Sequence, residues 1–372
     1  MRVLIASQFH YNAFKGGNEQ HAHQLSLGLA QAGHEVVYLS SSIVKPYELT
    51  YRHESLSVYS IFNQLFLKNV SLSVQTELQH ADIFHVFGFS PLLLQLLLRA
   101  KTHSPRLLTY PADAQPKNIF LSIVSRAHQQ MIPYMCDSLL TTTSAYEKML
   151  RNRWSNIPIH HVPLMIPAHI EADAFTKKQA RTKLSLDMKQ KHLLCVATLS
   201  SHHYYKGIPV LLKALTMLPQ EFHLHLVGDG DQRAKFIMLA EKLGISSRAT
   251  FHGSLDNEAM ATWYKAADLV VLPSTSLSEG FGLSLLEAMY CETPCLTTTI
   301  IGPAKYYASS KLCHLVKPND SLALAKAIST ALRSNNEAMI TRAKAWANTH
   351  TTKAMTQKTI SIYKATLQKH KL

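Results

Sequence analysis

The chain has 372 residues, of which 47% are hydrophobic, and a formal net charge of +14 at pH 7. This length is too great for one ordinary core, so we expect two globular α/β domains. The longest apolar block, residues 92–98, is interrupted by Gln95 and is far short of the roughly 20 residues that span a bilayer. The apolar run after Met1 is also too short for a secretory signal peptide. We therefore expect a cytoplasmic protein without a transmembrane segment.

Short apolar segments alternate with helical stretches along the whole chain, which predicts right-handed crossovers and parallel sheets. A polar, lysine-rich stretch at residues 171–191 separates two such series. We expect two doubly wound, Rossmann-like domains at residues 1–170 and 171–340, followed by a helix at 341–372 that has no strand partner. Ligands would bind in the cleft at the carboxyl ends of the strands. The predicted strands are residues 3–7, 36–40, 83–87, 106–110, 138–142 and 159–162, then 193–197, 223–227, 249–251, 269–272 and 294–298.

The segment Ser-Glu-Gly-Phe-Gly-Leu-Ser-Leu-Leu-Glu-Ala-Met carries the clearest chemical signal. It sets Glu279 and Glu287 on either side of a glycine-flanked helix start, directly after the buried strand 269–272. A helix start favours anions through its free N–H groups and its dipole. Glu287 would repel a bare phosphate but can accept hydrogen bonds from sugar hydroxyls. Phosphate and hydroxyls together indicate a nucleotide sugar.

Three glycine motifs follow predicted strands and point to the same cleft. Gly16 and Gly17 precede a helix and would let a ligand approach the backbone closely, although a plain turn explains them equally well. The ammonium of Lys206, next to Gly207, could neutralise a pyrophosphate. The loop at Gly228 lacks the spacing of a dinucleotide fingerprint, so it indicates only a phosphate or ribose neighbourhood.

Cysteine and histidine usage gives no sign of a metal site. The five cysteines are an odd number without a Cys-x-x-Cys pair, which is typical of a reducing compartment. The 21 histidines cluster in places, for example at His202 and His203, but no acidic or cysteine partner stands at ligand spacing. We expect neither a metal nor a cofactor.

The order of these pieces resembles the retaining glycosyltransferases of family 4, the group 1 glycosyl transferases, which have the two-domain GT-B fold. The matching text includes Gly-Gly-Asn-Glu-Gln-His, Lys-Gly-Ile-Pro-Val-Leu-Leu, Leu-Val-Gly-Asp-Gly, Phe-His-Gly, Ala-Ala-Asp-Leu-Val-Val-Leu-Pro-Ser and the pair of glutamates eight positions apart. The resemblance implies a hexosyltransferase that uses a nucleoside diphosphate sugar without a metal. Domain 1–170 would bind the acceptor, domain 171–340 would bind the nucleotide sugar, and the helix at 341–372 would cross back to the first domain. Its acceptor would be a glycan or a lipid-linked molecule in envelope polysaccharide or glycolipid synthesis.

The resemblance also implies roles for single residues. Glu279 would hold hydroxyls of the transferred sugar, Lys206 would stabilise the diphosphate leaving group, and Glu287 would bind the ribose. The implied acceptor or sugar side includes Gly16, His85 and Phe87. The other implied donor contacts are Gly17, Thr198, His203, Gly228, His252, Gly253, Phe281, Gly282 and Leu283.

Several residues depart from the family pattern. Thr198 stands where an arginine usually pairs with Lys206, and His203 could compensate for it as a donor. Phe87 stands where a histidine often touches the sugar, and Pro111 also replaces a common histidine. These changes keep an alternative open, namely a catalytically impaired scaffold that binds a nucleotide or glycan. The donor base, the sugar, the acceptor and the oligomeric state stay undetermined.

Two features bear on a membrane-associated acceptor. No acidic residue follows Glu337, whereas seven lysines and arginines do. Residues 117–134 carry apolar side chains at four-residue spacing, as a membrane-surface helix or a helix packed in the core would. A solvated helical face explains the basic tail, and contact with an anionic membrane at its inner face is the alternative. No basic patch has interleaved aromatics, so we expect no nucleic acid partner.

Overall fold

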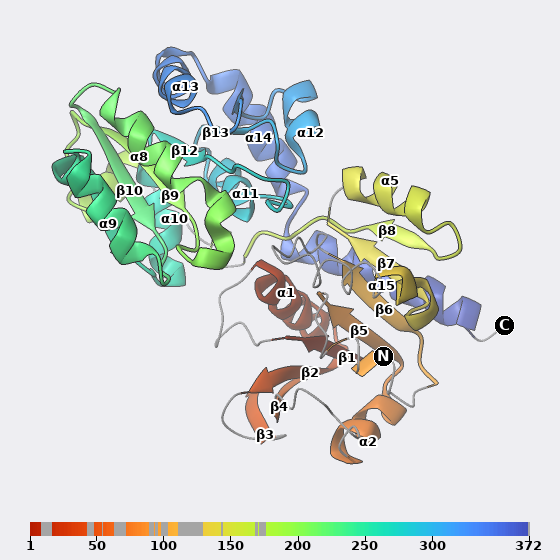
Figure 1. The fold of residues 1–372 in the computed structure, drawn as a ribbon. Coiled ribbons are helices and arrows are strands. Elements are labelled where there is room, and N and C mark those ends of the chain that lie inside the picture. The colour runs from red at the N-terminus through yellow and green to blue at the C-terminus, as the bar shows by residue number, and fades with distance from the viewer. Residues whose placement is uncertain are drawn as a thin grey trace. The chain divides into compact units, whose positions relative to one another are not determined.

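The computed structural model describes residues 1–8, 17–42, 48–53, 55–62, 72–88, 93, 96–97, 103–110, 129–142, 144–167, 170 and 176–370. The chain divides into two compact units (Figure 1). Unit 1 consists of Met1–Met165 and Thr352–Leu372, and unit 2 of Ile166–Thr351. The boundaries between the units thus lie after residues 165 and 351, whereas the boundaries predicted from the sequence lie after residues 170 and 340. No helix among these residues is long and apolar enough to cross a membrane.

Unit 1 is built on an eight-stranded sheet with the order β3-β4-β2-β1-β5-β6-β7-β8. All neighbouring strands are parallel except β3, which pairs with β4 in the antiparallel direction. Its strands are β1 (Arg2–Ser7), β2 (Glu35–Ser42), β3 (Glu48–His53), β4 (Leu56–Phe62), β5 (Ile83–Phe87), β6 (Arg106–Tyr110), β7 (Ser138–Thr141) and β8 (Ile159–His161). Its helices include α1 (Gly17–Gln31), α2 (Leu72–His80), α5 (Ser144–Arg153) and α15 (Thr352–His370).

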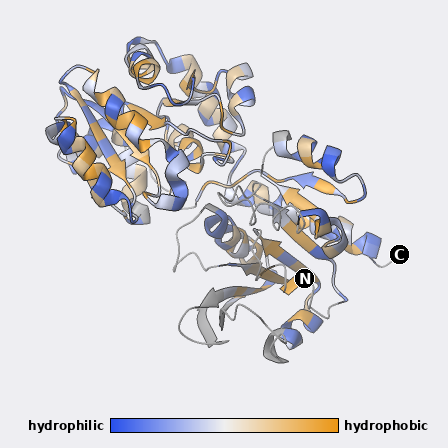
Figure 2. Cartoon of the chain, viewed as in Figure 1, coloured by the Kyte–Doolittle hydropathy of each residue, from blue (hydrophilic) through white to orange (hydrophobic). Residues whose placement is uncertain are grey.

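Both faces of this sheet are buried. Side chains alternate along each strand, so successive residues of one strand belong to different hydrophobic clusters. On β1, Leu4 and Ala6 belong to one hydrophobic cluster. The intervening Val3 and Ile5 belong to another, which includes residues of α1 and α15. Apolar residues accordingly dominate the described strands in the hydropathy view (Figure 2). The sequence prediction of a doubly wound sheet is confirmed here.

The C-terminal helix α15 is part of the core of unit 1. A Cβ atom at Gly28 would lie 2.2 Å from Thr356 Oγ1, so only glycine lets α1 and α15 approach this closely. Tyr363 of α15 is fully buried. The helix expected at residues 341–372 is in fact two helices, because α14 (Glu337–Asn348) packs against α11 (Leu283–Tyr290) in unit 2.

Unit 2 has a six-stranded, wholly parallel sheet with the order β11-β10-β9-β12-β13-β14. Its strands are β9 (Lys191–Val196), β10 (Phe222–Val227), β11 (Ala249–Gly253), β12 (Leu269–Leu272), β13 (Cys295–Thr298) and β14 (His314–Val316). Besides α11 and α14, its helices are α7 (Lys177–Lys183), η1 (Ser201–Lys206), α8 (Ile208–Thr216), α9 (Arg233–Lys242), η2 (Ser246–Arg248), α10 (Asn257–Ala266), α12 (Ala304–Ser309) and α13 (Ser321–Arg333). The strand order reverses between β9 and β12, the place where ligands of such sheets bind.

Candidate functional site

The turn from β12 to α11 exposes the first N–H groups of a helix at the carboxyl edge of the sheet. Gly282 caps α11 with a φ of 79°, in the left-handed region. A Cβ atom there would lie 2.9 Å from Leu272 Cδ2, so the turn can close only over a glycine. The first N–H groups of a helix have no intrahelical acceptor and lie at the positive end of its dipole. This turn is therefore suited to a negatively charged ligand.

Lys206 and Glu279 form an ion pair beside this turn. Lys206 Nζ donates to Glu279 Oε2 over 2.6 Å, and Ser274 Oγ donates to the same oxygen over 3.1 Å. The two charged side chains are only 18% and 8% exposed. Burial acts to lower the pKa of Lys206, but Glu279 and Tyr205 outweigh it, and the net effect is a raised pKa. The ammonium is therefore fully charged at neutral pH.

The Lys206-Gly207 dipeptide has this form because it docks on the end of β12. Gly207 has a φ of 71°, and a Cβ atom there would lie 2.0 Å from the carbonyl oxygen of Pro273. The N–H of Thr275 donates to the carbonyl of Tyr205 over 2.7 Å, which fixes the two loops together. Glycine after the lysine is thus a requirement of packing, and this packing delivers the ammonium to Glu279.

Glu287 lies one and a half turns into α11 and is 8% exposed. Its Oε2 accepts a hydrogen bond from the hydroxyl of Tyr264, on α10, over 2.6 Å. Burial first, and then the charge of Glu287, raise the pKa of Tyr264 well above its usual value, so the phenol stays a donor. A carboxylate has about four lone-pair sites on its two oxygens, so this bond leaves acceptor capacity. Sequence reasoning missed Tyr264, because a tyrosine on the buried face of a helix has no signal of its own.

The glycine loop after β10 packs tightly against the loop after β9. Cβ atoms at Gly228 and Gly230 would lie 1.9 and 2.4 Å from the carbonyl oxygens of Ala197 and Leu199. The N–H of Gly228 also donates to the carbonyl of Gly253 over 2.8 Å. Close approach of backbone segments therefore explains these glycines without a ligand. Thr198 is half-buried between the two loop contacts.

His203 precedes Lys206 in η1 and is half-buried. Its Nδ1 lies 2.6 Å from the hydroxyl of Ser200. Burial, and then the positive charge of Lys206, lower the pKa of His203. It is therefore a neutral hydrogen-bonding group at pH 7 and does not replace the charge of a missing arginine.

His252 is the end of a chain of three histidines that the sequence did not reveal. Its Nε2 lies 3.1 Å from His225 Nδ1, and His225 Nε2 lies 3.0 Å from His192 Nδ1. His192 Nε2 lies 2.8 Å from the carbonyl oxygen of Asp187, which can only accept. Each Nε2 must therefore carry the proton and donate along the chain. Burial is the main cause that lowers the pKa of all three histidines, that of His225 to about 3.

Aromatic side chains pack against Phe281, which lies in the turn from β12 to α11. Phe281 is 6% exposed, and its ring stacks with that of Trp346 at a centroid distance of 6.2 Å and an angle of 18°. Trp346 also packs against His350, with 4.2 Å between the ring centroids. The carbonyl of His350 accepts from the N–H of Ile166 over 2.8 Å. A backbone hydrogen bond thus links the two segments that connect the units, and both of its residues belong to unit 2. Trp346 packs against both His350 and Phe281.

In unit 1, His85 and Phe87 are completely buried. His85 Nδ1 lies 2.6 Å from the Tyr363 hydroxyl, and its Nε2 lies 2.8 Å from Thr109 Oγ1. Both ring nitrogens are therefore occupied inside the core, and neither is offered to a sugar in this arrangement. Gly17 begins α1. Gly16 and Pro111 lie outside the described residues.

No three histidine, cysteine, aspartate or glutamate side chains converge to hold a metal ion within the described part of the chain.

Comparison with known families agrees with this geometry. The model described as Glycosyltransferase Family 4 matches residues 15–168, and the one described as Glycosyl transferases group 1 matches residues 176–346. The chain belongs to the family 4 glycosyltransferases. Both units are included in these matches, and the group 1 match contains Lys206, Glu279 and Glu287.

Individual relatives and solved structures extend the comparison. D-inositol 3-phosphate glycosyltransferase of Xylanimonas cellulosilytica is 27% identical over 218 residues, which are 55% of this chain and 50% of that protein. The matched region therefore spans about half the length of this relative. Sucrose-phosphate synthase of Thermosynechococcus elongatus has a TM-score of 0.79 at 21% identity and covers 98% of this chain and 99% of that one. Anabaena HepE in complex with UDP has a TM-score of 0.77 at 17% identity, with 98% and 100% covered. The fold is therefore GT-B.

Proposed function

We propose that this family 4 glycosyltransferase moves a hexose from a nucleoside diphosphate sugar to a glycan or lipid-linked acceptor. The observation that carries the proposal is the ion pair of Lys206 and Glu279 beside the start of α11. It combines a permanently charged ammonium, a carboxylate and free helical N–H groups at one edge of the sheet. The ammonium and the helical N–H groups can bind phosphate oxygens, and the carboxylate can accept hydrogen bonds from sugar hydroxyls.

The charge of the leaving group is the main electrostatic problem of such a transfer. An ammonium has three N–H donors, so Lys206 can keep its bond to Glu279 and still donate to a diphosphate. The α11 terminus adds the positive end of its dipole. Preorganised donors of this kind stabilise developing charge strongly, because they need no reorganisation during the reaction. In this proposal they supply the positive charge, and no metal ion takes part.

The two carboxylates divide the rest of the donor between them. Glu287, steadied by Tyr264, accepts the ribose hydroxyls, and Glu279 accepts a hydroxyl of the transferred sugar. Backbone groups of Phe281 and Leu283 meet the sugar and the phosphates. A solved structure of Anabaena HepE contains UDP, which supports a uridine nucleotide as the first donor to test.

The proposed reaction retains the anomeric configuration. The acceptor oxygen bonds to the anomeric carbon on the face from which the diphosphate leaves, and a phosphate oxygen of the leaving group takes the acceptor proton. This scheme needs no side-chain nucleophile. Glu279 is held by Lys206 and Ser274, so its role in the proposal is to orient the sugar.

Two features support an acceptor that is lipid-linked or part of an envelope polysaccharide. The chain after Glu337 is basic and carries no acid, which favours an anionic surface such as the inner face of a membrane. Met131 and Tyr134 are 45% and 80% exposed, so the end of the 117–134 segment presents apolar side chains to solvent. The remainder of that segment up to residue 128 lies outside the described residues.

A two-step measurement tests the proposal. Nucleoside diphosphates are first screened by thermal shift, and release of the best one from its sugar forms is then assayed with and without EDTA. Wild type should release it, and Glu287→Ala should lose both the shift and the release. Glu241→Ala, which removes an exposed acid of α9, is the matched control and should behave as wild type.

The impaired scaffold remains the second candidate, and one observation favours it. Thr198 offers no charge where the family usually has an arginine, and His203 is neutral. Loss of one cation of this kind costs about 1 to 3 kcal/mol, roughly 10- to 100-fold in rate. Nucleotide binding without any release in the same assay would favour the scaffold, and absence of nucleotide binding would remove both candidates.

A further inference from the structure

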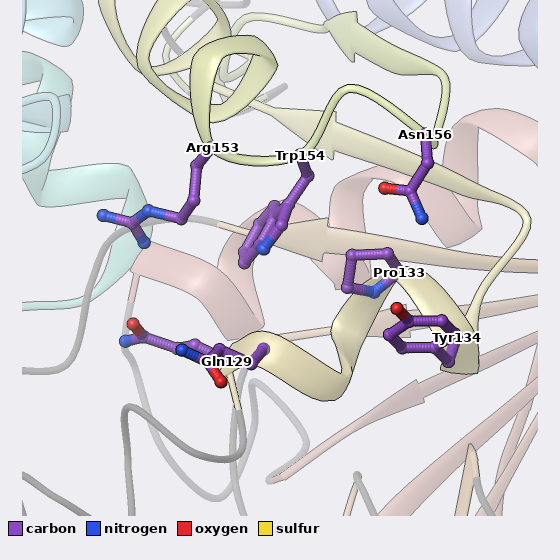
Figure 3. A pocket seen from close by; sticks show the side chains of 7 residues that line it. Gln129, Pro133, Tyr134, Arg153, Trp154 and Asn156 are labelled. Carbon is purple, nitrogen blue, oxygen red and sulfur yellow. The ribbon is translucent and has the colours of Figure 1, made fainter.

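A hollow of about 590 Å³ lies on unit 1 between two short segments of the chain. One is the helical segment 129–135, and the other is the end of α5 with the loop that follows it. Figure 3 shows Gln129, Pro133 and Tyr134 on one side and Arg153, Trp154 and Asn156 on the other. This volume is within the range of about 300 to 1,000 Å³ that is usual for small-molecule sites.

The hollow is separate from the edge of the sheet where Rossmann-like domains bind their ligands. The 129–135 segment leads into the amino end of β7, and the loop after Arg153 leads into the amino end of β8. These two strands are parallel neighbours, so their amino ends lie at one edge. Their carboxyl ends lie at the opposite edge.

The aromatic side chains of the hollow are partly fixed in place. The ring of Trp154 meets that of Tyr110 edge-on at 5.8 Å, and the guanidinium of Arg153 lies 5.5 Å from its centroid. Tyr134 is 80% exposed, an unusual degree for so large an aromatic residue. Trp154 is only 6% exposed and forms part of the wall, so Tyr134 is the aromatic ring that offers a ligand an open face.

The remaining lining is polar and, among the residues that the structure describes, carries no carboxylate. Gln129, Gln130 and Asn156 offer amides, each of which both donates and accepts hydrogen bonds. A hydroxyl group also donates and accepts, so amides match the edge of a sugar ring, while its C–H face packs on an aromatic ring. A lipid chain would call for an apolar lining. A phosphate would call for more than Arg153, the one cation in the described part of the lining.

We propose that this hollow binds a saccharide, as a second glycan site of the protein apart from the transfer site. Tyr134 would pack on a sugar ring, while the amides and Arg153 would bind hydroxyl or carboxylate groups of the saccharide. Such a site would bind a polymeric glycan in addition to the proposed transfer site. The proposal concerns binding alone, so it stands or falls independently of the transferase activity.

The test uses nucleotide-free, full-length protein and two probes, maltoheptaose as a neutral glycan and a hyaluronan hexasaccharide as an acidic one. Binding is measured by calorimetry and by saturation-transfer NMR in wild type, Tyr134→Ala and Asn156→Ala. Met131→Ala is the control, because Met131 is 45% exposed on the same segment but does not line the hollow. We expect saturable binding of at least one probe, weakened by tenfold or more, about 1.4 kcal/mol, in both lining variants.

Three outcomes would overturn the proposal. One is that neither probe binds wild type at concentrations up to about 10 mM, which corresponds to affinities too weak to matter. The second is that binding survives in both lining variants but is lost in Glu287→Ala, which would put the sugar at the transfer site. The third is that phosphatidylglycerol vesicles bind wild type, do not bind Tyr134→Ala, and neither oligosaccharide competes with them.

Discussion

Lys206 Nζ and Glu279 Oε2 lie 2.6 Å apart, although 73 positions separate the two residues in the chain. The contact joins the loop after β9 to the turn after β12, the two neighbouring strands at which the sheet order reverses. It makes the phosphate-binding cation and the sugar-binding carboxylate of the proposed site a single unit. Glu279 contributes to the raised pKa of Lys206, and Lys206 is the cation that pairs with the buried Glu279 carboxylate, so neither can be removed without a consequence for its partner.

Removing Lys206 alone should therefore destabilise unit 2 as well as impair binding. Lys206→Met leaves Glu279 buried without its cation, and breaking such a pair costs about 3 kcal/mol. The double variant Lys206→Met/Glu279→Gln removes both charges and should recover most of that loss. Chemical denaturation of the three proteins measures this, and equal stability of the single variant and wild type would show that the pair is not formed.

Tyr264 should matter for donor affinity through Glu287. Tyr264→Phe removes the hydroxyl that donates to Glu287 Oε2, so the carboxylate loses one fixed orientation and a charged hydrogen bond. We expect the KM for the nucleotide sugar to rise about tenfold, equivalent to about 1.4 kcal/mol, with a smaller change in kcat. Tyr306→Phe, at an exposed position of α12 in unit 2, is the control for the substitution itself. An unchanged KM in Tyr264→Phe would contradict the positioning role.

The histidine chain should make the stability of unit 2 depend on pH. The pKa of His225 is lowered to about 3 in the folded protein, whereas its unperturbed value is about 6.5. The unfolded chain therefore binds this proton at higher pH, so stability is full above about pH 6.5 and is lost as the pH falls below it. The ring of Trp263 packs on that of His225. Positive charge on His192, His252 or His223 would lower the pKa of His225 further, so these neighbours act in the same direction as burial.

His225→Phe isolates that contribution from those of the other buried histidines. The free energy of unfolding of wild type should fall between pH 6.5 and pH 4 more steeply than that of the variant, by up to about 1.4 kcal/mol per pH unit. The slope is measured by denaturation at a series of pH values. Identical slopes in the two proteins would show that His225 does not titrate as the burial of its ring implies.

Gly28 should be required for the C-terminal helix to dock on unit 1. Gly28→Ala would gain up to about 1 kcal/mol of intrinsic helix propensity. Its Cβ atom, however, would lie 2.2 Å from Thr356 Oγ1, and overpacking of this kind costs about 1 to 3 kcal/mol. We expect lower thermal stability in Gly28→Ala and recovery in Gly28→Ala/Thr356→Ala. Gly33→Ala is not a suitable control, because Gly33 has a φ of 81°, where alanine would be strained for a different reason. A Gly28→Ala variant more stable than wild type would contradict this packing.

The sequence was informative where one local segment determines both structure and chemistry. The buried strand 269–272, the glycine at Gly282 and the glutamates Glu279 and Glu287 lie within one strand, turn and helix, and their arrangement follows from spacing alone. Strands β3, β4 and β14, which the sequence did not predict, lack such signals. No Asn-Gly or Asp-Gly pair marks the turn between β3 and β4, and β14 is only three residues long.

Contacts between distant segments were beyond sequence reasoning. The pairing of Lys206 with Glu279 depends on strand order, which places β9 beside β12. The histidine chain depends on the register of β9, β10 and β11, because its three members come from three strands. His85 illustrates the opposite case. The family resemblance implied a sugar contact for it, but Tyr363, 278 positions later, occupies one of its nitrogens.

The most direct test of the account is the rate of nucleoside diphosphate release from nucleotide sugars, UDP-glucose first, by wild type and Lys206→Ala. The two proteins are compared at a temperature where both are folded by circular dichroism. Lys206 is assigned to the developing charge of the leaving group, so we predict that kcat/KM falls at least 100-fold, about 2.7 kcal/mol. A Lys206→Ala protein that is folded and releases the nucleotide at the wild-type rate would contradict the account.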